Sequence, residues 1–252
     1  MSLHNKTAII TGGSRGIGAG IAIELARLGA NILLTYISSA QKASEIVSQI
    51  TSSGGAAIAV QADCMDPASP QKIVSAATAA FGARIDIVVN NAGAGDELYL
   101  ADCTLEHFDK VFYTNVRFPM FLVKECLPYL PRGGRVVNVS SVCARQGWPM
   151  QTAYSASKAC MESFAKTWAA ELGHTYGITV NAVNPGPVAT DMWNATPVDA
   201  VPGMQNYIDI TPAAPRVGEV DDVVQVVAFL CEERSRWVTG STVCANGGAC
   251  FV

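Results

Sequence analysis

A phenol and a primary amine stand four residues apart in this 252-residue sequence, at Tyr154 and Lys158. Residues at that spacing share one face of a helix, so the amine can act on the phenol. A free phenol has a pKa of about 10 and is a poor acid-base catalyst at neutral pH, whereas a nearby ammonium group favours the phenolate. Tyr154 is therefore a candidate proton donor. Taken alone, the pair equally fits a half-buried helical contact.

A glycine-rich turn, Thr11–Gly18 (TGGSRGIG), follows a short β-branched run and opens a helical pattern. Glycine allows a sharp turn and a close approach to a pyrophosphate, and the free N–H groups at a helix start attract that anion. Gly12, Gly16 and Gly18 fit these roles, although their spacing differs from the commoner Gly-x-Gly-x-x-Gly fingerprint. We expect a dinucleotide cofactor here. A purely structural strand-to-helix turn is the competing interpretation.

The segment after the second expected strand distinguishes NADPH from NADH. NAD-selective folds carry an acidic residue about 20 residues beyond the glycines, which binds the ribose 2′-hydroxyl. Here Thr35–Ser39 (TYISS) contains none, and the next acidic residue is Glu45. Hydroxyls of Ser38 and Ser39 and the cation of Arg15 can hold a 2′-phosphate, which a carboxylate would repel. The sequence predicts NADPH; for Arg15 the alternative is a solvated loop cation.

Further polar residues follow in a fixed order: Asn90-Asn91-Ala92-Gly93, then Asn115, then Ser140-Ser141. Together with the glycine turn, Tyr154 and Lys158, this ordered set resembles the short-chain dehydrogenase/reductase family. The resemblance extends from Thr7 to about Gly248 and implies a Rossmann fold. One departure is Asn246-Gly247-Gly248, where the family often has Asp-Gly-Gly; it lies outside the expected chemistry.

The resemblance implies a role for each catalytic candidate. Tyr154 is the general acid in carbonyl reduction and the base in alcohol oxidation. Ser141 hydrogen-bonds the substrate oxygen and stabilises the charge that develops there. Lys158 lowers the tyrosine pKa and binds the nicotinamide ribose, and Asn115 holds a water in a proton relay toward Lys158. The alternative for Asn115 is that it only satisfies buried backbone groups.

The resemblance also implies a set of cofactor contacts. Asp63 and Cys64 follow the third expected strand and would contact the adenine, although Asp63 is equally suited to capping a turn. Residues 184–186 and 188–190 would seat the nicotinamide carboxamide. The full set is Gly12, Ser14, Arg15, Gly16, Ile17, Gly18, Tyr36, Ser38, Ser39, Asp63, Cys64, Asn90, Ala92, Gly93, Tyr154, Lys158, Pro185, Gly186, Val188 and Thr190.

Short β-branched runs alternate with helical patterns, which is typical of βαβ units and a parallel sheet. Seven strands are expected, at Thr7–Ile10, Asn31–Thr35, Ala56–Gln61, Ile85–Val89, Arg135–Val139, Thr179–Val183 and Thr242–Ala245. Helices are expected at Ile17–Leu28, Ala40–Ser52, Ser69–Phe81 and Thr152–Tyr176, and in a stretch ending near Pro128. The sequence therefore predicts an α/β fold over residues 1–252, with one domain and a seven-stranded parallel sheet covered by helices on both faces.

Helical periodicity is lost over residues 186–215, a proline-rich stretch that we call the lid segment. An irregular stretch of this length inside a compact domain is commonly an active-site lid. Large apolar residues there and after Ser141 favour a bulky, aromatic or polyketide-like substrate over a small hydroxy acid. With Ser141, the expected substrate contacts are Trp148, Met150, Trp193, Met204 and Tyr207, with Met192 nearby. The alternative is that half of these only pack the lid segment against the core.

A narrower resemblance is to fungal polyketide ketoreductases that act on hydroxynaphthalene or anthraquinone substrates. It rests on Arg15, on the Tyr-x-Ser-Ser segment that begins at Tyr36, and on the C-terminal Gly-Gly-Ala-Cys-Phe-Val. Family members are usually dimers or tetramers joined through two long helices, so the resemblance implies a homo-oligomer.

Composition excludes several other classes. A net charge of −4 offers no basic surface for nucleic acid, and no apolar run reaches the roughly 18 residues of a membrane span. No secretory signal is recognisable, so a cytoplasmic location is expected. Eight cysteines without zinc-type spacing are expected to be mostly small buried hydrophobes, and His4, His107 and His174 are expected at the surface. No metal is expected.

Three alternative functions remain. A 3-oxoacyl carrier-protein reductase should have a basic surface near the pocket, for which Arg117, Arg132 and Arg145 are candidates. A non-reducing catalyst on the same fold, such as a dehydratase or cyclase, is the second, and a nucleotide-sensing regulator is the third. The intact set of Ser141, Tyr154 and Lys158 argues against the last two.

Overall fold

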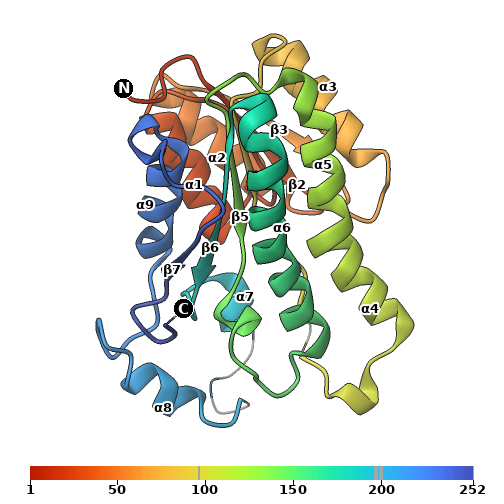
Figure 1. Cartoon of the computed structure of the whole chain (residues 1–252), viewed down its shortest axis with the longest axis vertical. Helices are drawn as coiled ribbons and strands as arrows, with labels where there is room; N and C mark the ends of the chain where they lie inside the picture. The colour runs from red at the N-terminus through yellow and green to blue at the C-terminus, as the bar shows by residue number, and fades with distance from the viewer. Residues whose placement is uncertain (96, 196–197, 199–200, 252) are drawn as a thin grey trace.

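A seven-stranded parallel sheet forms the centre of the computed structural model, which describes residues 1–95, 97–195, 198 and 201–251 (Figure 1). The strands are β1 (Thr7–Ile10), β2 (Asn31–Tyr36), β3 (Ala56–Gln61), β4 (Ile87–Asn90), β5 (Arg135–Val139), β6 (Thr179–Pro185) and β7 (Thr242–Ala245). Their order is β3-β2-β1-β4-β5-β6-β7, and every neighbouring pair is parallel. The predicted sheet is confirmed. The strand order reverses between β1 and β4, where α/β folds open a ligand-binding crevice at the carboxyl ends of the strands.

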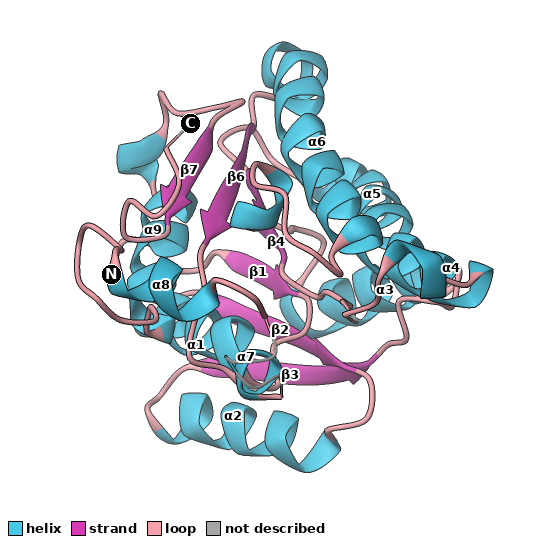
Figure 2. Cartoon of the chain, turned by 90° about the horizontal axis from the view of Figure 1, so that it is seen from below, coloured by secondary structure: helices cyan, strands magenta, loops and turns pink. Residues whose placement is uncertain are grey.

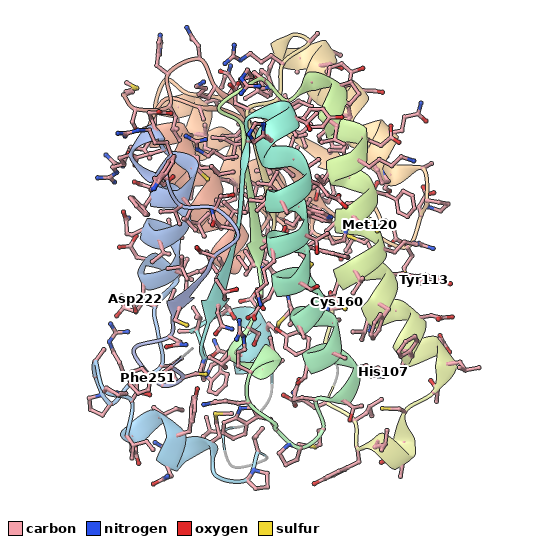
Figure 3. The ribbon with its side chains drawn as sticks, in the orientation of Figure 1. His107, Tyr113, Met120, Cys160, Asp222 and Phe251 are labelled. Atoms are coloured by element: carbon pink, nitrogen blue, oxygen red, sulfur yellow. The ribbon has the colours of Figure 1, made fainter. Side chains whose placement is uncertain are left out.

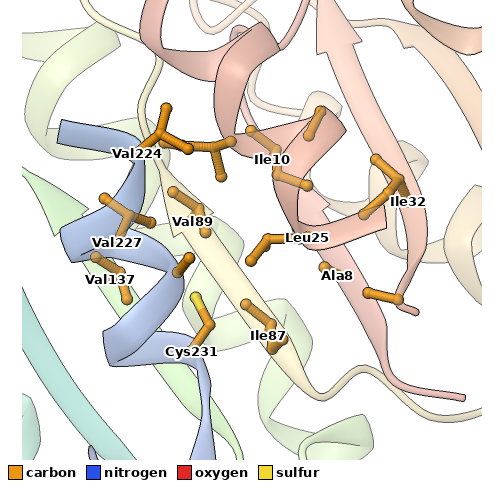
Figure 4. Close-up of a cluster of buried hydrophobic side chains, with 14 of the residues drawn as sticks. Ala8, Ile10, Leu25, Ile32, Ile87, Val89, Val137, Val224, Val227 and Cys231 are labelled. Atoms are coloured by element: carbon orange, nitrogen blue, oxygen red, sulfur yellow. The ribbon is translucent and has the colours of Figure 1, made fainter. Parts of the chain in front are cut away.

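Helices cover both faces of the sheet (Figure 2). On one face lie α1 (Gly16–Arg27), α2 (Ala40–Ser52) and α9 (Val220–Cys231). Leu25 of α1 and Val227 of α9 are buried there in one cluster with Ile10 of β1 and Val89 of β4 (Figure 4). On the other lie α3 (Ser69–Phe81), α5 (Phe118–Cys126) and α6 (Thr152–Tyr176), which pack on the opposite side chains of the same strands. Because both faces are covered, every residue of β1, β4 and β5 is buried, instead of buried and exposed residues alternating along each strand.

Two helical features were absent from the sequence prediction. Helix α9 begins after a capping box in which the Glu219 and Asp222 side chains each bond the other's backbone N–H. Val220–Cys231 is rich in valine, a residue type that is also common in strands. The stretch before Pro128 is also divided: α4 (Leu105–Phe112) passes through a π-helical turn, Tyr113–Arg117, into α5.

The lid segment was expected to be irregular, but it contains two short helices, α7 (Asp191–Asn194) and α8 (Met204–Asp209). The Thr190 hydroxyl caps α7 by accepting a hydrogen bond from the Trp193 N–H, at 3.3 Å. Residues 196–197 and 199–200 of this segment, Pro197 among them, lie outside the described residues.

The expected surface position of His107 is wrong. His107 and Val111 are four residues apart and form the buried face of α4, which packs against α6 near the position labelled in Figure 3. Only 8% of His107 is exposed, and neither ring nitrogen has a hydrogen-bond partner among the described residues. Burial of the cysteines was also overestimated: Cys126, Cys231 and Cys250 are buried, and the other five are partly exposed.

Within the described ranges, no helix combines the length and apolar character needed to cross a bilayer. The same residues contain no group of three or more His, Cys, Asp or Glu side chains able to hold a metal ion.

Candidate active site

The glycine turn between β1 and α1 has the backbone that an anion site needs. Gly12 and Gly16 adopt positive φ angles of 65° and 54°, which side chains rarely tolerate. A Cβ on Gly18 would lie 2.3 Å from the Gly12 carbonyl oxygen, so only glycine permits this contact. Helix α1 begins without a side-chain cap and without an acidic residue in its first turn. Its first N–H groups therefore remain available to a phosphate, and the residues present fit a dinucleotide pyrophosphate.

Asn91, one of the residues 90–93 expected to line the cofactor cleft, holds this turn against β4. Its Nδ2 donates to the carbonyl oxygens of Thr11, at 2.9 Å, and Gly12, at 3.2 Å. The Thr11 hydroxyl in turn accepts from the backbone N–H groups of Asn91 and Ala92, both at 3.0 Å. The carboxyl ends of β1 and β4 are thereby fixed together beside Gly93.

Asn90 was expected to line the cofactor cleft, but its side chain points into the protein. Its Nδ2 donates to Asn138 Oδ1 on β5 at 2.8 Å, and Asn138 donates to the Met161 carbonyl oxygen at 3.2 Å. Nothing in the sequence distinguishes the two consecutive asparagines, because the direction of the Asn90 side chain depends on its partner on β5.

At the carboxyl end of β2, Tyr36 is half-buried, Ser38 is exposed, and Ser39 precedes α2 without forming a side-chain cap. The Arg15 side chain is 59% exposed, with Nη1 3.9 Å from Asp191 Oδ2 of α7. Lys42 of α2, which was not among the expected contacts, lies 2.8 Å from the same oxygen.

The residues expected at the adenine position have local structural roles. Asp63 Oδ1 accepts from the Met65 N–H at 2.8 Å, and the Asp63 carbonyl oxygen accepts from the Ser69 hydroxyl at 2.7 Å. The carboxylate therefore caps a turn, as the alternative interpretation proposed. Cys64 packs against the apolar cluster under α3, and burial raises the pKa of its thiol to about 12.

The segment expected to seat the carboxamide leads from β6 to the glycine turn. Pro185 and Val188 are buried, and Gly186 and Thr190 are partly exposed. A Cβ placed on Gly16 would lie 3.3 Å from Thr190 Cγ2, so the lid segment begins directly against the turn.

Asn115 lies in the π-helical turn and is almost completely buried. Its side chain forms two hydrogen bonds with the backbone of Ala94: Oδ1 accepts from the Ala94 N–H and Nδ2 donates to the Ala94 carbonyl oxygen, both at 2.8 Å. Nδ2 also donates to the Ser157 hydroxyl at 2.9 Å. A π-turn inserts an extra residue and redirects the helix, and here it joins α4, α6 and the loop after β4.

Lys158 lies in the first turns of α6 and is buried, with Nζ donating to the Val139 carbonyl oxygen at 2.8 Å. Burial lowers the pKa of this amine to about 8. A Cβ on Gly93 would lie 3.4 Å from Lys158 Nζ and 3.6 Å from Asn115 Oδ1, so the two polar groups flank this glycine. The amine also lies 5.6 Å from the centre of the Tyr154 ring.

Tyr154 and Ser141 are brought together from α6 and the end of β5. Burial, followed by the interaction with Cys143, raises the pKa of Tyr154, and a hydrogen bond with the Ser141 side chain opposes this effect. Lys158 is not among the groups that shift this pKa, since its amine is bonded to the Val139 carbonyl oxygen and lies 5.6 Å from the ring centre. The phenol therefore keeps its proton at neutral pH. The expected lowering of the Tyr154 pKa by Lys158 stays a prediction.

Cys143, two residues beyond Ser141, was not expected in this site. Its backbone N–H donates to Ser141 Oγ at 3.2 Å, and its thiol hydrogen-bonds the Ser141 side chain. Burial is the largest cause of the raised pKa of this thiol.

A buried carboxylate lies beneath the serine. Glu162, one turn after Lys158, accepts from the Ser140 hydroxyl at 3.1 Å, from Asn184 Nδ2 at 2.7 Å, and from Arg145 Nε. Asn184 also donates to the Ser141 carbonyl oxygen at 2.7 Å. The network ties the loop after β5 to α6 and β6.

Two of the expected substrate contacts lie side by side. Trp148 and Tyr207 of α8 form an edge-to-face pair with ring centroids 5.0 Å apart. Met150 has a positive φ of 65°, an unfavourable conformation that places its carbonyl oxygen 3.1 Å from the Leu98 nitrogen. Met204 is buried and Trp193 is partly exposed, whereas Met192 is 56% exposed.

The three arginines named for a carrier-protein surface do not form one. Arg145 turns inward to Glu162, and Arg117 stacks on the Tyr113 ring while donating to the Met65 carbonyl oxygen. Arg132 lies beside Gly177, at the other end of α6.

Comparison with known proteins places the chain in a family. The model of a family described as enoyl-(acyl carrier protein) reductase matches residues 12–250. The short-chain dehydrogenase/reductase FrzI of Cladobotryum sp. is 50% identical over 98% of this chain and 96% of its own length. A probable tetrahydroxynaphthalene reductase of Zymoseptoria tritici is 37% identical over 99% of this chain and 96% of its own.

A solved short-chain dehydrogenase from Burkholderia cenocepacia, in complex with NADP, has a TM-score of 0.91 and 38% identity, and the match covers 99% of both chains. The resemblance inferred from the ordered motifs, including that to fungal hydroxynaphthalene-type reductases, is confirmed. The chain belongs to the short-chain dehydrogenase/reductase family.

Proposed function

We propose that this protein uses NADPH to reduce a ketone on a bulky, aromatic or polyketide-like small molecule to a secondary alcohol, with Tyr154 donating the proton. The observation that carries this proposal is the meeting of Ser141, Tyr154 and Lys158 at the carboxyl edge of the sheet, next to the glycine turn.

The chain's own groups suit the proton-transfer half of the reaction. The raised pKa of Tyr154 keeps the phenol protonated at neutral pH, which is the state that a reduction requires. Ser141 contacts this phenol, so both hydroxyls can donate to one carbonyl oxygen and stabilise its developing charge. When bound, NADPH supplies the hydride to the carbonyl carbon.

Lys158 and Asn115 support the proton donor. With a pKa of about 8, the amine is mainly charged at neutral pH and stabilises the phenolate left after transfer. Lys158 and Asn115 flank Gly93 and form a polar path behind Tyr154, along which a water can return the proton. The nicotinamide ribose would lie against Lys158.

For the cofactor, Gly12, Gly16 and Gly18 would hold the pyrophosphate at the start of α1, and Arg15, Ser38 and Ser39 the 2′-phosphate. The Burkholderia cenocepacia relative, solved with NADP, supports this assignment. Remaining contacts are proposed from Ser14, Ile17, Tyr36, Asp63, Cys64, Ala92, Gly93, Pro185, Gly186, Val188 and Thr190.

For the substrate, the pair of Trp148 and Tyr207 offers aromatic faces and edges for a planar molecule, with Met150, Trp193 and Met204 completing the wall. The relative named as a tetrahydroxynaphthalene reductase supports an aromatic substrate. The carrier-protein alternative lacks comparable support, because its three candidate arginines are dispersed and Arg145 is paired with Glu162.

We also propose a homo-oligomer joined through α4 and α5. These helices leave Leu105, Phe108, Met120 and Phe121 exposed, and Figure 3 shows Met120 on the outer side of α5. Exposed apolar patches of this kind mark protein contacts.

The test is a panel of aromatic polyketide ketones, 3-oxoacyl thioesters and small 2-oxo acids, followed by the loss of NADPH or NADH absorbance. We expect turnover of the aromatic ketones with NADPH. A clear preference for NADH, or turnover of the thioesters alone, would contradict the proposal.

A further inference from the structure

Three charged side chains from separate segments meet beside the glycine turn. Arg15 immediately precedes α1, Lys42 lies in the first turn of α2, and Asp191 begins α7 in the lid segment. Both cations approach one oxygen: Asp191 Oδ2 is 2.8 Å from Lys42 Nζ and 3.9 Å from Arg15 Nη1. Two cations that converge on one carboxylate oxygen form a position suited to an anion.

The start of α2 adds to this positive character. Ser39 is its N-cap residue but forms no side-chain cap, and the first turn contains no acidic residue. Free N–H groups and the positive end of the helix dipole therefore add to the positive potential at the start of the helix that carries Lys42. Asp191 responds to these charges, because its pKa is lowered first by Lys42 and more weakly by Arg15.

The ion pairs with Asp191 are easily exchanged. The side chains of Arg15, Lys42 and Asp191 are 59%, 52% and 54% exposed, and ion pairs in this environment contribute little to stability. A phosphate monoester carries close to two negative charges and three acceptor oxygens, so it competes well against a single carboxylate. An adenosine without this phosphate offers only a hydroxyl.

We propose that Lys42 is a second cation for the 2′-phosphate of NADPH beside Arg15, and that Asp191 competes with that phosphate for both cations. This inference rests on the proposed NADPH function and deepens it. The phosphate displaces Asp191 and breaks its link to α2, whereas NADH leaves the link in place. Lys42 and Asp191 therefore determine cofactor preference, and they connect cofactor binding to the start of the lid segment.

The test uses the full chain and two probes that differ only in the 2′-phosphate, adenosine 2′,5′-bisphosphate and adenosine 5′-monophosphate, measured by calorimetry at low salt. Lys42→Gln should lower the affinity for the bisphosphate roughly tenfold, as expected for the loss of one partly exposed charge-assisted contact, and should change the affinity for the monophosphate by no more than about twofold. Lys42→Arg keeps the charge and should retain the wild-type preference for the bisphosphate over the monophosphate. Asp191→Asn removes the competing charge and should tighten bisphosphate binding about two- to threefold. Lys166→Gln, an exposed lysine of α6, is the matched control.

The outcomes separate the two proposals. If the wild-type chain binds both probes equally, the NADPH preference fails and this inference fails with it. If the wild-type chain prefers the bisphosphate and Lys42→Gln retains that preference as fully as Lys166→Gln, NADPH use stands and the role of Lys42 is overturned. Weaker bisphosphate binding by Asp191→Asn would overturn the competing role of Asp191.

Discussion

Replacing Glu162 by glutamine is expected to lower both the stability and the turnover of the protein. Glu162 is 3% exposed and accepts hydrogen bonds from Ser140, Asn184 and Arg145. Glutamine keeps the shape but loses the charge, and its NH₂ group must face a donor, either Asn184 Nδ2 or the Arg145 guanidinium. The second partner of Asn184 is the Ser141 carbonyl oxygen, so the disturbance reaches the candidate catalytic serine.

The geometry sets the size of the effect. Breaking a fully buried ion pair by removing one charge costs about 3–5 kcal/mol. The Arg145 side chain is 32% exposed and can turn toward water, which reduces the loss to that of one hydrogen bond to a charged group, about 1.5–3 kcal/mol. We therefore expect the free energy of unfolding to fall by about 2 kcal/mol, together with a several-fold fall in kcat.

The assay is urea unfolding of Glu162→Gln followed by tryptophan fluorescence and circular dichroism, with kcat and KM measured on the same preparations. Glu171→Gln is the matched control, because Glu171 lies on the same helix but is exposed. An unfolding midpoint and a kcat equal to those of the control would refute the positioning role assigned to this carboxylate.

Two further predictions concern Tyr154 and Lys158. In Gly95→Ala the added Cβ would lie 2.7 Å from Cδ2 of the Tyr154 ring, so steady-state assays should show reduced turnover. Gly147→Ala is the control and should turn over normally, because its added Cβ would have no neighbour within 4 Å. Equal rates for the two variants would contradict the contact between residue 95 and the ring. The pKa of Lys158 in the folded chain, about 8, lies below its usual 10.5, so between about pH 8 and 10 the unfolded chain binds a proton that the folded chain has released. The free energy of unfolding of the cofactor-free protein should therefore rise across this pH window, by on the order of 1–3 kcal/mol relative to that of Lys158→Met. Parallel pH profiles of the two unfolding free energies would exclude the lowered pKa of Lys158.

The strands and the backbone of the cofactor site could be predicted because their signals are local. β-Branched runs of four to seven residues marked β1 to β7, and the Thr11–Gly18 turn requires positive φ at two positions that only glycine adopts readily. The spacing of Tyr154 and Lys158 likewise depends only on helical geometry. Each of these features follows from neighbouring residues in the chain.

What could not be predicted depends on contacts between distant segments. The sequence suggests a surface position for Arg145, but its side chain pairs with Glu162 of α6. The importance of Lys42 depends on its contact with Asp191, which lies 149 residues away in the sequence. The inward direction of Asn90 depends on its bond to β5. The burial of His107 depends on α4 packing against α6.

Turnover by Tyr154→Phe tests the central claim most directly, because this change removes the proposed acid and leaves the ring in place. The variant should fold and bind NADPH as tightly as the wild-type chain, measured by the quenching of tryptophan fluorescence, and its kcat for ketone reduction should fall at least about 100-fold. Wild-type turnover in a variant that binds NADPH normally would contradict the mechanism.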